Sequence, residues 1–335
     1  KPGISKDTKY RVLRVARELK YTPNLVARSL VSRQSDSVAL LITNTKNPIF
    51  PEIGLGVEEV LQQTGLFLNI ISTFDDLKIE GKKIGNMRAR GIDGLIASCG
   101  LIDDPHLTQL VREGFPTVSV LRRIYTCPEM DYVIVDNVKG GYMAVEHLIK
   151  LGHRRIAVIM GPQNTSTGLE RYQGAMLAME AYGIPVNKNL LFEGDYFRAC
   201  GYLATNSFLS LPPDERPSAI YSCNDDMAMG AFEAILDAGF SVPEDMALVG
   251  FNNVEATSLR TVEMTTIEQH SMEMGRLAAR RLIQKVGIQP GCNKPYQVTL
   301  EPELVVRKTC GYHQKGYRSE IGTTIQPKMS GGNIV

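Results

Sequence analysis

The chain has 335 residues, of which 43% are hydrophobic and 22% charged, and its formal net charge is +1. This composition is ordinary for a globular protein, and no run of about 18 apolar residues is present that could cross a membrane. The charge is uneven, because the first 35 residues carry nine Lys or Arg and only two Asp or Glu. A basic arm on a neutral-to-acidic body predicts a polyanion as the partner of the arm and a different task for the body.

Several protein classes lack support in the sequence. The N-terminus has no apolar segment of the kind that a signal peptide needs, and the six cysteines are scattered without a CxxC pair. We therefore expect a cytoplasmic protein with free thiols. The five histidines lack metal-ligand spacing, and no phosphate-binding loop or nucleophile–base arrangement is present. The sequence thus predicts neither an enzyme nor a protein with a metal or cofactor.

The basic arm is expected to begin with a helix over residues 5–20. Ser5 or Asp7 can cap this helix, and apolar residues recur along it at helical spacing. Pro23 ends it, because proline cannot donate a backbone hydrogen bond and restricts the residue before it. Residues 24–31 then read as one or two helical turns, which are too short to be stable without a partner.

From residue 37 the chain alternates between strand-like and helical patterns. Strands are expected at residues 37–43, 66–72, 93–98, 116–121, 132–135 and 155–160, and in a second unit at 190–193, 219–223 and 247–251. Helices are expected at residues 51–64, 77–90, 104–112, 138–151, 168–182, 198–209, 225–238 and 272–286, followed by an extended segment at 296–306. This rhythm predicts an α/β protein with two doubly wound parallel-sheet subdomains.

Polar and aromatic residues just past the predicted strands are the candidates for a binding site. In parallel α/β sheets, ligands bind beyond the carboxyl ends of the strands. The candidates are Phe50, Asp136, Arg171, Tyr196, Asn224, Asp225 and Asn252. Aromatic faces stack on sugar rings and polar groups pair with hydroxyls, so a small polar ligand such as a sugar fits this set.

Simpler roles stay open for several of these candidates. Arg171 could form a surface ion pair, and Asp225 could cap the helix that it opens. Phe50 and Tyr196 could belong to the core, and Asp136 could anchor a loop.

Eight short motifs follow one another along the chain. They are Asn47-Pro48-Ile49-Phe50, Val135-Asp136-Asn137 with Gly140-Gly141, Gly152-His153-Arg154-Arg155-Ile156, Arg171 with Gly174, the segment 224–231, Val242-Pro243-Glu244-Asp245 with Val249-Gly250-Phe251, Thr265-Thr266-Ile267, and Glu303-Leu304-Val305-Val306-Arg307. In this order and spacing they resemble the lac-repressor family of bacterial transcription regulators, over about residues 1–309. The effector domain of that family is similar to periplasmic sugar-binding proteins.

The resemblance implies a role in DNA binding for the arm. Residues 1–22 are similar to the end of the family's helix-turn-helix headpiece, so we expect an N-terminally truncated chain without its recognition helix. Residues 23–35 are similar to the hinge helix and linker. The resemblance implies that Leu30 wedges into the minor groove at the centre of the operator, beside Asn24, Ala27 and Arg28.

The resemblance also implies how the body is divided. One effector subdomain is expected at residues 36–160 plus 271–296, the other at 162–269 plus 297–310, and a disordered tail at 311–335. Three crossovers are expected near Gly161, Gln269 and Tyr296. Asn252 departs from the family pattern, because many members carry an acidic residue there, and this removes a charged acceptor for ligand hydroxyls.

The function implied is a ligand-responsive transcriptional regulator, by family prevalence a repressor. Its partners would be a palindromic operator, a small carbohydrate-like effector and a second copy of the chain, because a two-fold protein matches a palindromic site. The alternative is a solute-binding protein of a transport or sensing system, which would share the body but has no use for the basic arm.

Overall fold

The computed structural model describes residues 5–19, 35–287 and 294–312. The first helix, α1 (Lys6–Glu18), begins where predicted, and the Ser5 side chain caps it by accepting a hydrogen bond from the Thr8 amide. The predicted hinge helix, and the predicted tail beyond residue 312, lie outside the described residues.

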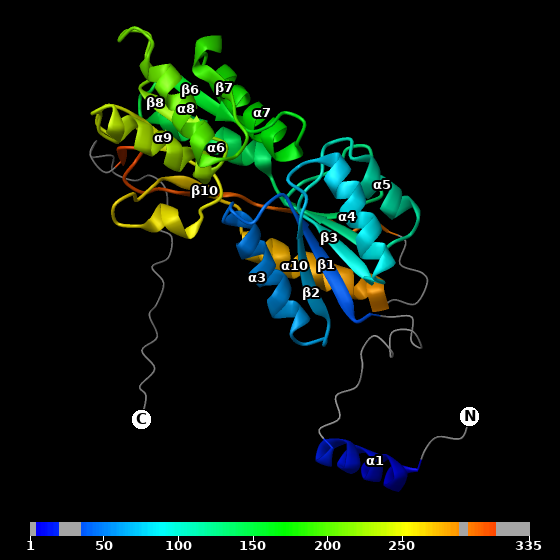
Figure 1. Cartoon of the computed structure of the whole chain (residues 1–335). Helices are drawn as coiled ribbons and strands as arrows, with labels where there is room; N and C mark the ends of the chain where they lie inside the picture. Colours follow the sequence, from blue (N-terminus) through cyan, green and yellow to red (C-terminus); the bar gives the residue numbers. More distant parts are fainter. Residues whose placement is uncertain (1–4, 20–34, 288–293, 313–335) are drawn as a thin grey trace, which may run out of the picture.

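The N-terminal subdomain is built on a six-stranded sheet with the order β11-β5-β4-β3-β1-β2, and all its strand pairs are parallel. Its strands are β1 (Ser37–Ile42), β2 (Phe67–Ser72), β3 (Gly94–Ala97), β4 (Thr117–Val120), β5 (Asp131–Val135) and β11 (Gln297–Leu300). Helices α3 (Ile49–Leu61) and α10 (Ser271–Gly287) pack on one face, while α4 (Leu77–Ala89) and α5 (Pro105–Arg112) pack on the other (Figure 1). The central strands are therefore apolar on both faces, as their continuous hydrophobic runs predicted.

The C-terminal subdomain is built on a parallel four-stranded sheet with the order β7-β6-β8-β9. Its strands are β6 (Ile156–Met160), β7 (Leu191–Glu193), β8 (Ala219–Ser222) and β9 (Ala247–Val249), and its helices are α6 (Asn137–Lys150), α7 (Ser166–Ala181), α8 (Arg198–Leu209) and α9 (Asp225–Asp237). An antiparallel pair, β10 (Thr266–Glu268) with β12 (Glu303–Val305), adjoins this sheet. The sequence analysis missed β10, because three residues carry too little periodicity to identify a strand.

Three helix pairs pack backbone against backbone through reciprocal glycines. In the pair α6–α7, a Cβ on Gly141 would lie 2.2 Å from the Arg171 carbonyl oxygen, and one on Gly174 would lie 2.0 Å from that of Val138. Gly56 and Gly275 play the same part for α3 and α10, as do Gly201 and Gly230 for α8 and α9. Any side chain at these positions would hold the helices apart, so glycine is what permits the close approach.

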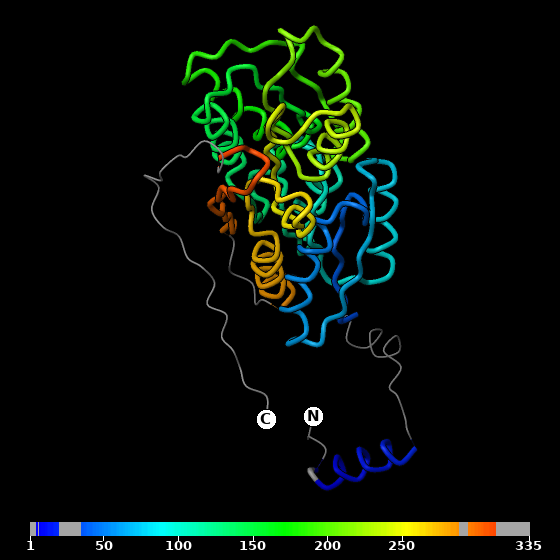
Figure 2. Tube along the Cα trace, turned by 90° about the vertical axis from the view of Figure 1, so that its left-hand side faces the viewer, coloured from blue at the N-terminus to red at the C-terminus, as the bar shows by residue number. Residues whose placement is uncertain are grey.

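Two of the three predicted crossovers lie elsewhere in the structure. Strand β6 pairs with β7 and β8, and α6 packs on α7, so the chain first changes subdomain between β5 and α6 rather than near Gly161. Strand β11 pairs with β5, so the last crossover follows Leu300 rather than Tyr296. The second lies between β10 and α10, at the predicted Gln269. Figure 2 shows α10 returning beside the N-terminal segments.

Candidate functional site

A cavity of about 260 Å³ lies between the two subdomains, at the carboxyl ends of their strands. The N-terminal subdomain contributes Thr43, Asn44, Asn47, Ile49, Phe50, Phe74, Asp75, Leu121 and Arg122 to its wall. The C-terminal subdomain contributes Thr167, Arg171, Asp195, Tyr196, Phe197, Asn224 and Asn252. The volume falls below the roughly 300–1,000 Å³ of sites for drug-sized ligands, so the cavity suits a smaller molecule.

Five of the seven candidates from the sequence line this cavity: Phe50, Arg171, Tyr196, Asn224 and Asn252. Two of them also hold the local structure. The Asn224 side chain caps α9 by accepting from the Met227 amide, and it donates to the Tyr196 carbonyl. The Tyr196 hydroxyl reaches Thr165 and Thr167 at the start of α7, at 3.0 and 2.8 Å. These bonds fix the direction of both side chains at the cavity wall.

Asp136 and Asp225 lie outside the lining. Asp136 caps α6 by accepting from the Lys139 amide. Asp225 is fully buried and accepts from the Thr266 hydroxyl at 2.6 Å and the Val254 amide at 3.0 Å. Burial raises the pKa of Asp225 to about 6. Both carboxylates thus accept hydrogen bonds from the protein itself, and effector contact by either stays a prediction.

Arg171 is the most heavily bonded side chain of the wall. Its guanidinium donates to Asn137 Oδ1, the Cys223 carbonyl, Asn252 Oδ1 and Gln269 Oε1, at 2.7–3.1 Å. It also stacks on the Phe251 ring, with 3.7 Å between the guanidinium carbon and the ring centroid. These contacts join α6, the ends of β8 and β9, and the second crossover, so Arg171 holds one whole side of the cavity together.

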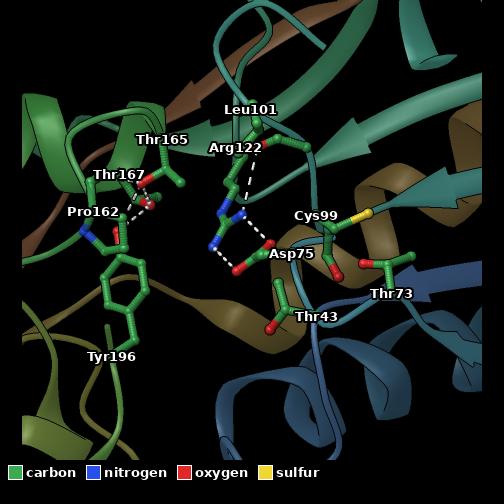
Figure 3. Close-up of polar contacts among 12 residues, drawn as sticks. Thr43, Thr73, Asp75, Cys99, Leu101, Arg122, Pro162, Thr165, Thr167 and Tyr196 are labelled. Carbon is green, nitrogen blue, oxygen red and sulfur yellow. Dashed lines mark hydrogen bonds and ion pairs between the residues drawn. The ribbon is translucent and has the colours of Figure 1, made fainter. Parts of the chain in front are cut away.

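Arg122 faces the cavity from the opposite subdomain, and the sequence analysis missed it. Its guanidinium donates to both oxygens of Asp75, at 2.8 and 3.3 Å, and lies 5.8 Å from the centroid of the Tyr196 ring (Figure 3). Burial lowers the pKa of Arg122, but the Asp75 carboxylate and the other nearby groups together outweigh burial, so the pKa is raised. Arg122 lies two residues past the end of β4 and directly follows the strand expected at residues 116–121, so the strand-end argument that selected the other candidates would have selected it too.

Glu170, next to Arg171, makes direct contacts with the other subdomain. The Glu170 carboxylate accepts from Arg123 at 3.0 Å and from the Tyr125 hydroxyl at 2.8 Å, both on the loop after β4. Its other oxygen accepts from Asn137, whose own side-chain oxygen accepts from Arg171. Hydrogen bonds therefore connect the cavity wall to the contact between subdomains.

The described residues hold neither a membrane-spanning helix nor a cluster of metal ligands. They contain no helix that is both long and apolar enough to span a membrane. Nor do these segments bring three or more His, Cys, Asp or Glu side chains together in a group suited to a metal ion.

Two α/β subdomains joined by three crossovers, with a small cavity between them, define a regulator or binding protein with a periplasmic-binding-protein-like body. The family model for "Periplasmic binding proteins and sugar binding domain of LacI family" matches residues 35–308. The chain belongs to this family, and its curated relatives make it a transcriptional regulator of the LacI type.

Those relatives match almost end to end. The HTH-type transcriptional repressor PurR of Haemophilus influenzae (strain PittEE) is 31% identical over 309 residues, which cover 91% of this chain and 90% of the relative. The ribose operon repressor of Haemophilus influenzae (strain ATCC 51907 / DSM 11121 / KW20 / Rd) is 31% identical over 307 residues, with the same coverage. A solved structure, the transcriptional regulator CelR–cellobiose complex, is similar with a TM-score of 0.75 and 31% identity, over 91% of each chain.

Proposed function

We propose that the cavity binds a small effector, a sugar or sugar derivative, and that binding alters the affinity of the protein for an operator. The observation that carries this proposal is the position of the cavity, whose wall is drawn from both subdomains. A ligand held there favours one relative arrangement of the two, and differential affinity for two arrangements is what regulation requires. The solved CelR complex, with its bound cellobiose, adds support by family likeness.

The effector contacts in this proposal are the lining residues Phe50, Arg171, Tyr196, Asn224 and Asn252. Asp136 and Asp225, which lie outside the lining, are kept in the proposal as further effector contacts. In the full-length protein, Asn24, Ala27, Arg28 and Leu30 contact the operator, and two copies of the chain bind its two halves. The protein acts as a cytoplasmic repressor without catalytic activity.

A screen of sugars and nucleosides, read by thermal unfolding, tests the first part of the proposal, because a ligand that binds the folded state raises the unfolding temperature. Operator affinity of the full-length protein is then measured with and without each ligand found, on DNA selected from a random pool. We expect at least one ligand to change operator affinity. A ligand that binds tightly but leaves DNA affinity unchanged would favour the solute-binding alternative.

The hinge assignment has its own test. Leu30→Ala in the full-length protein removes the apolar wedge, at a cost on the order of a few kcal/mol in operator binding. Affinity for random DNA at the same salt concentration is the control, since it depends mainly on phosphate contacts. Equal losses on both DNAs, or none, would leave residues 23–30 as a mere linker.

A further inference from the structure

The two arginines of the cavity wall differ in how their charges are balanced. Arg122 is 3% exposed and is held by both oxygens of Asp75. Arg171 is 2% exposed, and all four acceptors of its hydrogen bonds are neutral amide or carbonyl oxygens. Within the described residues, Arg171 forms no ion pair with a carboxylate at an N–O distance of 4.0 Å or less.

The nearest acids are occupied elsewhere. Glu170, its neighbour in sequence, forms its ion pair with Arg123. Asp225 is close enough to act on Arg171 through its charge, but its oxygens accept from Thr266 and Val254. In agreement with this, burial lowers the pKa of Arg171, whereas the pKa of Arg122 is raised. A buried cation that neutral groups alone solvate is less stable than one with an anionic partner of good geometry.

One hydrogen-bond donor of the Arg171 guanidinium is left over. A guanidinium has five N–H groups, and the four bonds of Arg171 use one at Nε, two at Nη1 and one at Nη2. The second N–H of Nη2 has no acceptor among the described residues, and Arg171 lines the cavity. An anionic oxygen in the cavity can therefore accept a hydrogen bond from this N–H group and at the same time balance the charge of Arg171.

We propose that the effector is an acidic monosaccharide, whose carboxylate or phosphate is the counter-ion of Arg171. This inference rests on the proposed function, and it adds the chemical class of the effector. The hydroxyls of such a molecule meet the amides of Asn44, Asn47 and Asn224 around the same cavity, and its ring meets Phe50 and Tyr196. The small volume favours one sugar ring with one acidic group.

Calorimetry with matched ligands at fixed ionic strength tests the proposal. The panel is glucose, glucuronate and glucose 6-phosphate, the three corresponding galactose compounds, and ribose with ribose 5-phosphate. We expect an acidic member to bind about tenfold or more tightly than its neutral parent, as a charged hydrogen bond in place of a neutral one would give. The two kinds of acid in the panel separate a carboxylate effector from a phosphate effector.

The variant Asn252→Asp supplies the missing carboxylate from the protein itself. Asn252 Oδ1 already accepts from Arg171 and Gln269, so both bonds can persist after the substitution. We expect the preference for the acidic ligand to fall by about tenfold or more, and the ligand-free variant to unfold at a higher temperature than the native protein. Gln173→Glu is the matched control, because it adds the same charge to an exposed position on α7, two residues from Arg171.

The outcomes separate the two levels of the proposal. A neutral sugar that binds as tightly as its acidic partner would overturn the charge assignment and leave effector binding by this cavity intact. Binding by no acid of the panel would overturn the assignment as well. A ligand-free Asn252→Asp protein no more stable than Gln173→Glu would show that the charge of Arg171 is already balanced, and this result too would refute the proposal.

Discussion

The contact between α6 and α7 gives a test in which two Gly→Ala substitutions should have opposite effects. Gly174 lies in the middle of α7, and a Cβ placed there would be 2.0 Å from the Val138 carbonyl oxygen and 2.7 Å from the Tyr142 nitrogen. Both obstacles are backbone atoms of α6, so neither can rotate away as a side chain would. The Gly174→Ala protein can accept the methyl group only if the helices separate.

The size of the effect follows from these distances. An ordinary contact begins at 3.4 Å, so the carbonyl oxygen of Val138 must retreat by roughly 1 Å or more. Overpacking of this kind costs about 1–3 kcal/mol, whereas alanine is favoured over glycine inside a helix by about 1 kcal/mol. We therefore expect the free energy of unfolding to fall by up to about 2 kcal/mol in Gly174→Ala.

Gly85→Ala is the matched control, because Gly85 is exposed inside α4 and a Cβ there would meet no atom within 4 Å. Here only the helix propensity acts, so this variant should gain about 0.5–1 kcal/mol. Urea unfolding monitored by circular dichroism measures both changes. If the free energy of unfolding rises as much in Gly174→Ala as in Gly85→Ala, the close approach of α6 and α7 at Gly174 is refuted. Effector affinity should fall only in Gly174→Ala, since α7 carries Arg171.

Three further substitutions test charges away from the cavity. Burial and the neighbouring Asp104 raise the pKa of Glu80 to about 8. The neutral form of Glu80 therefore stabilises the fold at low pH, and this stabilisation is lost as pH rises through 8. Glu80→Gln should remove this pH-dependent loss of stability in unfolding measurements from about pH 5 to about pH 9. Asp131 accepts from Arg281 at 2.8 Å and from the Tyr296 amide at 2.7 Å, so Asp131→Asn should cost on the order of 3 kcal/mol in thermal unfolding. Glu170→Gln should weaken effector binding about threefold to tenfold in calorimetry by loosening the contact between subdomains, whereas Glu129→Gln, whose partner Arg112 lies in the same subdomain, should not.

The elements could be predicted from the sequence because their signals are local. Continuous apolar runs mark the buried strands, and Asp76 and Asp104 stand where two helices were expected to begin, with side chains that accept from the first backbone amides. The crossovers could not be predicted in the same way, since the sheet that a strand joins depends on pairing with distant segments. Gly161 and Pro162 resemble a boundary in sequence, but β6 before them and α7 after them belong to the same subdomain.

The candidate site was predicted in part for a related reason. The strand-end rule places residues at the correct edge of a sheet, but it does not say where a short side chain turns. Asp136 turns back to cap its helix, whereas Asn252, in a left-handed conformation with φ of 128°, directs its oxygen to Arg171. Among the described residues Arg171 has no carboxylate partner, and this could not be predicted from the sequence, because it depends on the partners that Glu170 and Asp225 have in three dimensions.

The N-terminal subdomain depends on the last part of the chain. Helix α10 docks on α3 through Gly56 and Gly275, and it places Met274, Ala278 and Leu282 in the core on that face of the sheet. Strand β11 pairs with β5 and thereby covers the edge that β5 would otherwise present to solvent. Both elements follow strands β6 to β10 of the C-terminal subdomain in the chain, and only β12 of that subdomain comes after them. A fragment of residues 37–135 would therefore expose an apolar sheet face and an unpaired edge, both of which favour aggregation over folding. The interleaved topology makes the two subdomains one folding unit, even though each has its own sheet and core.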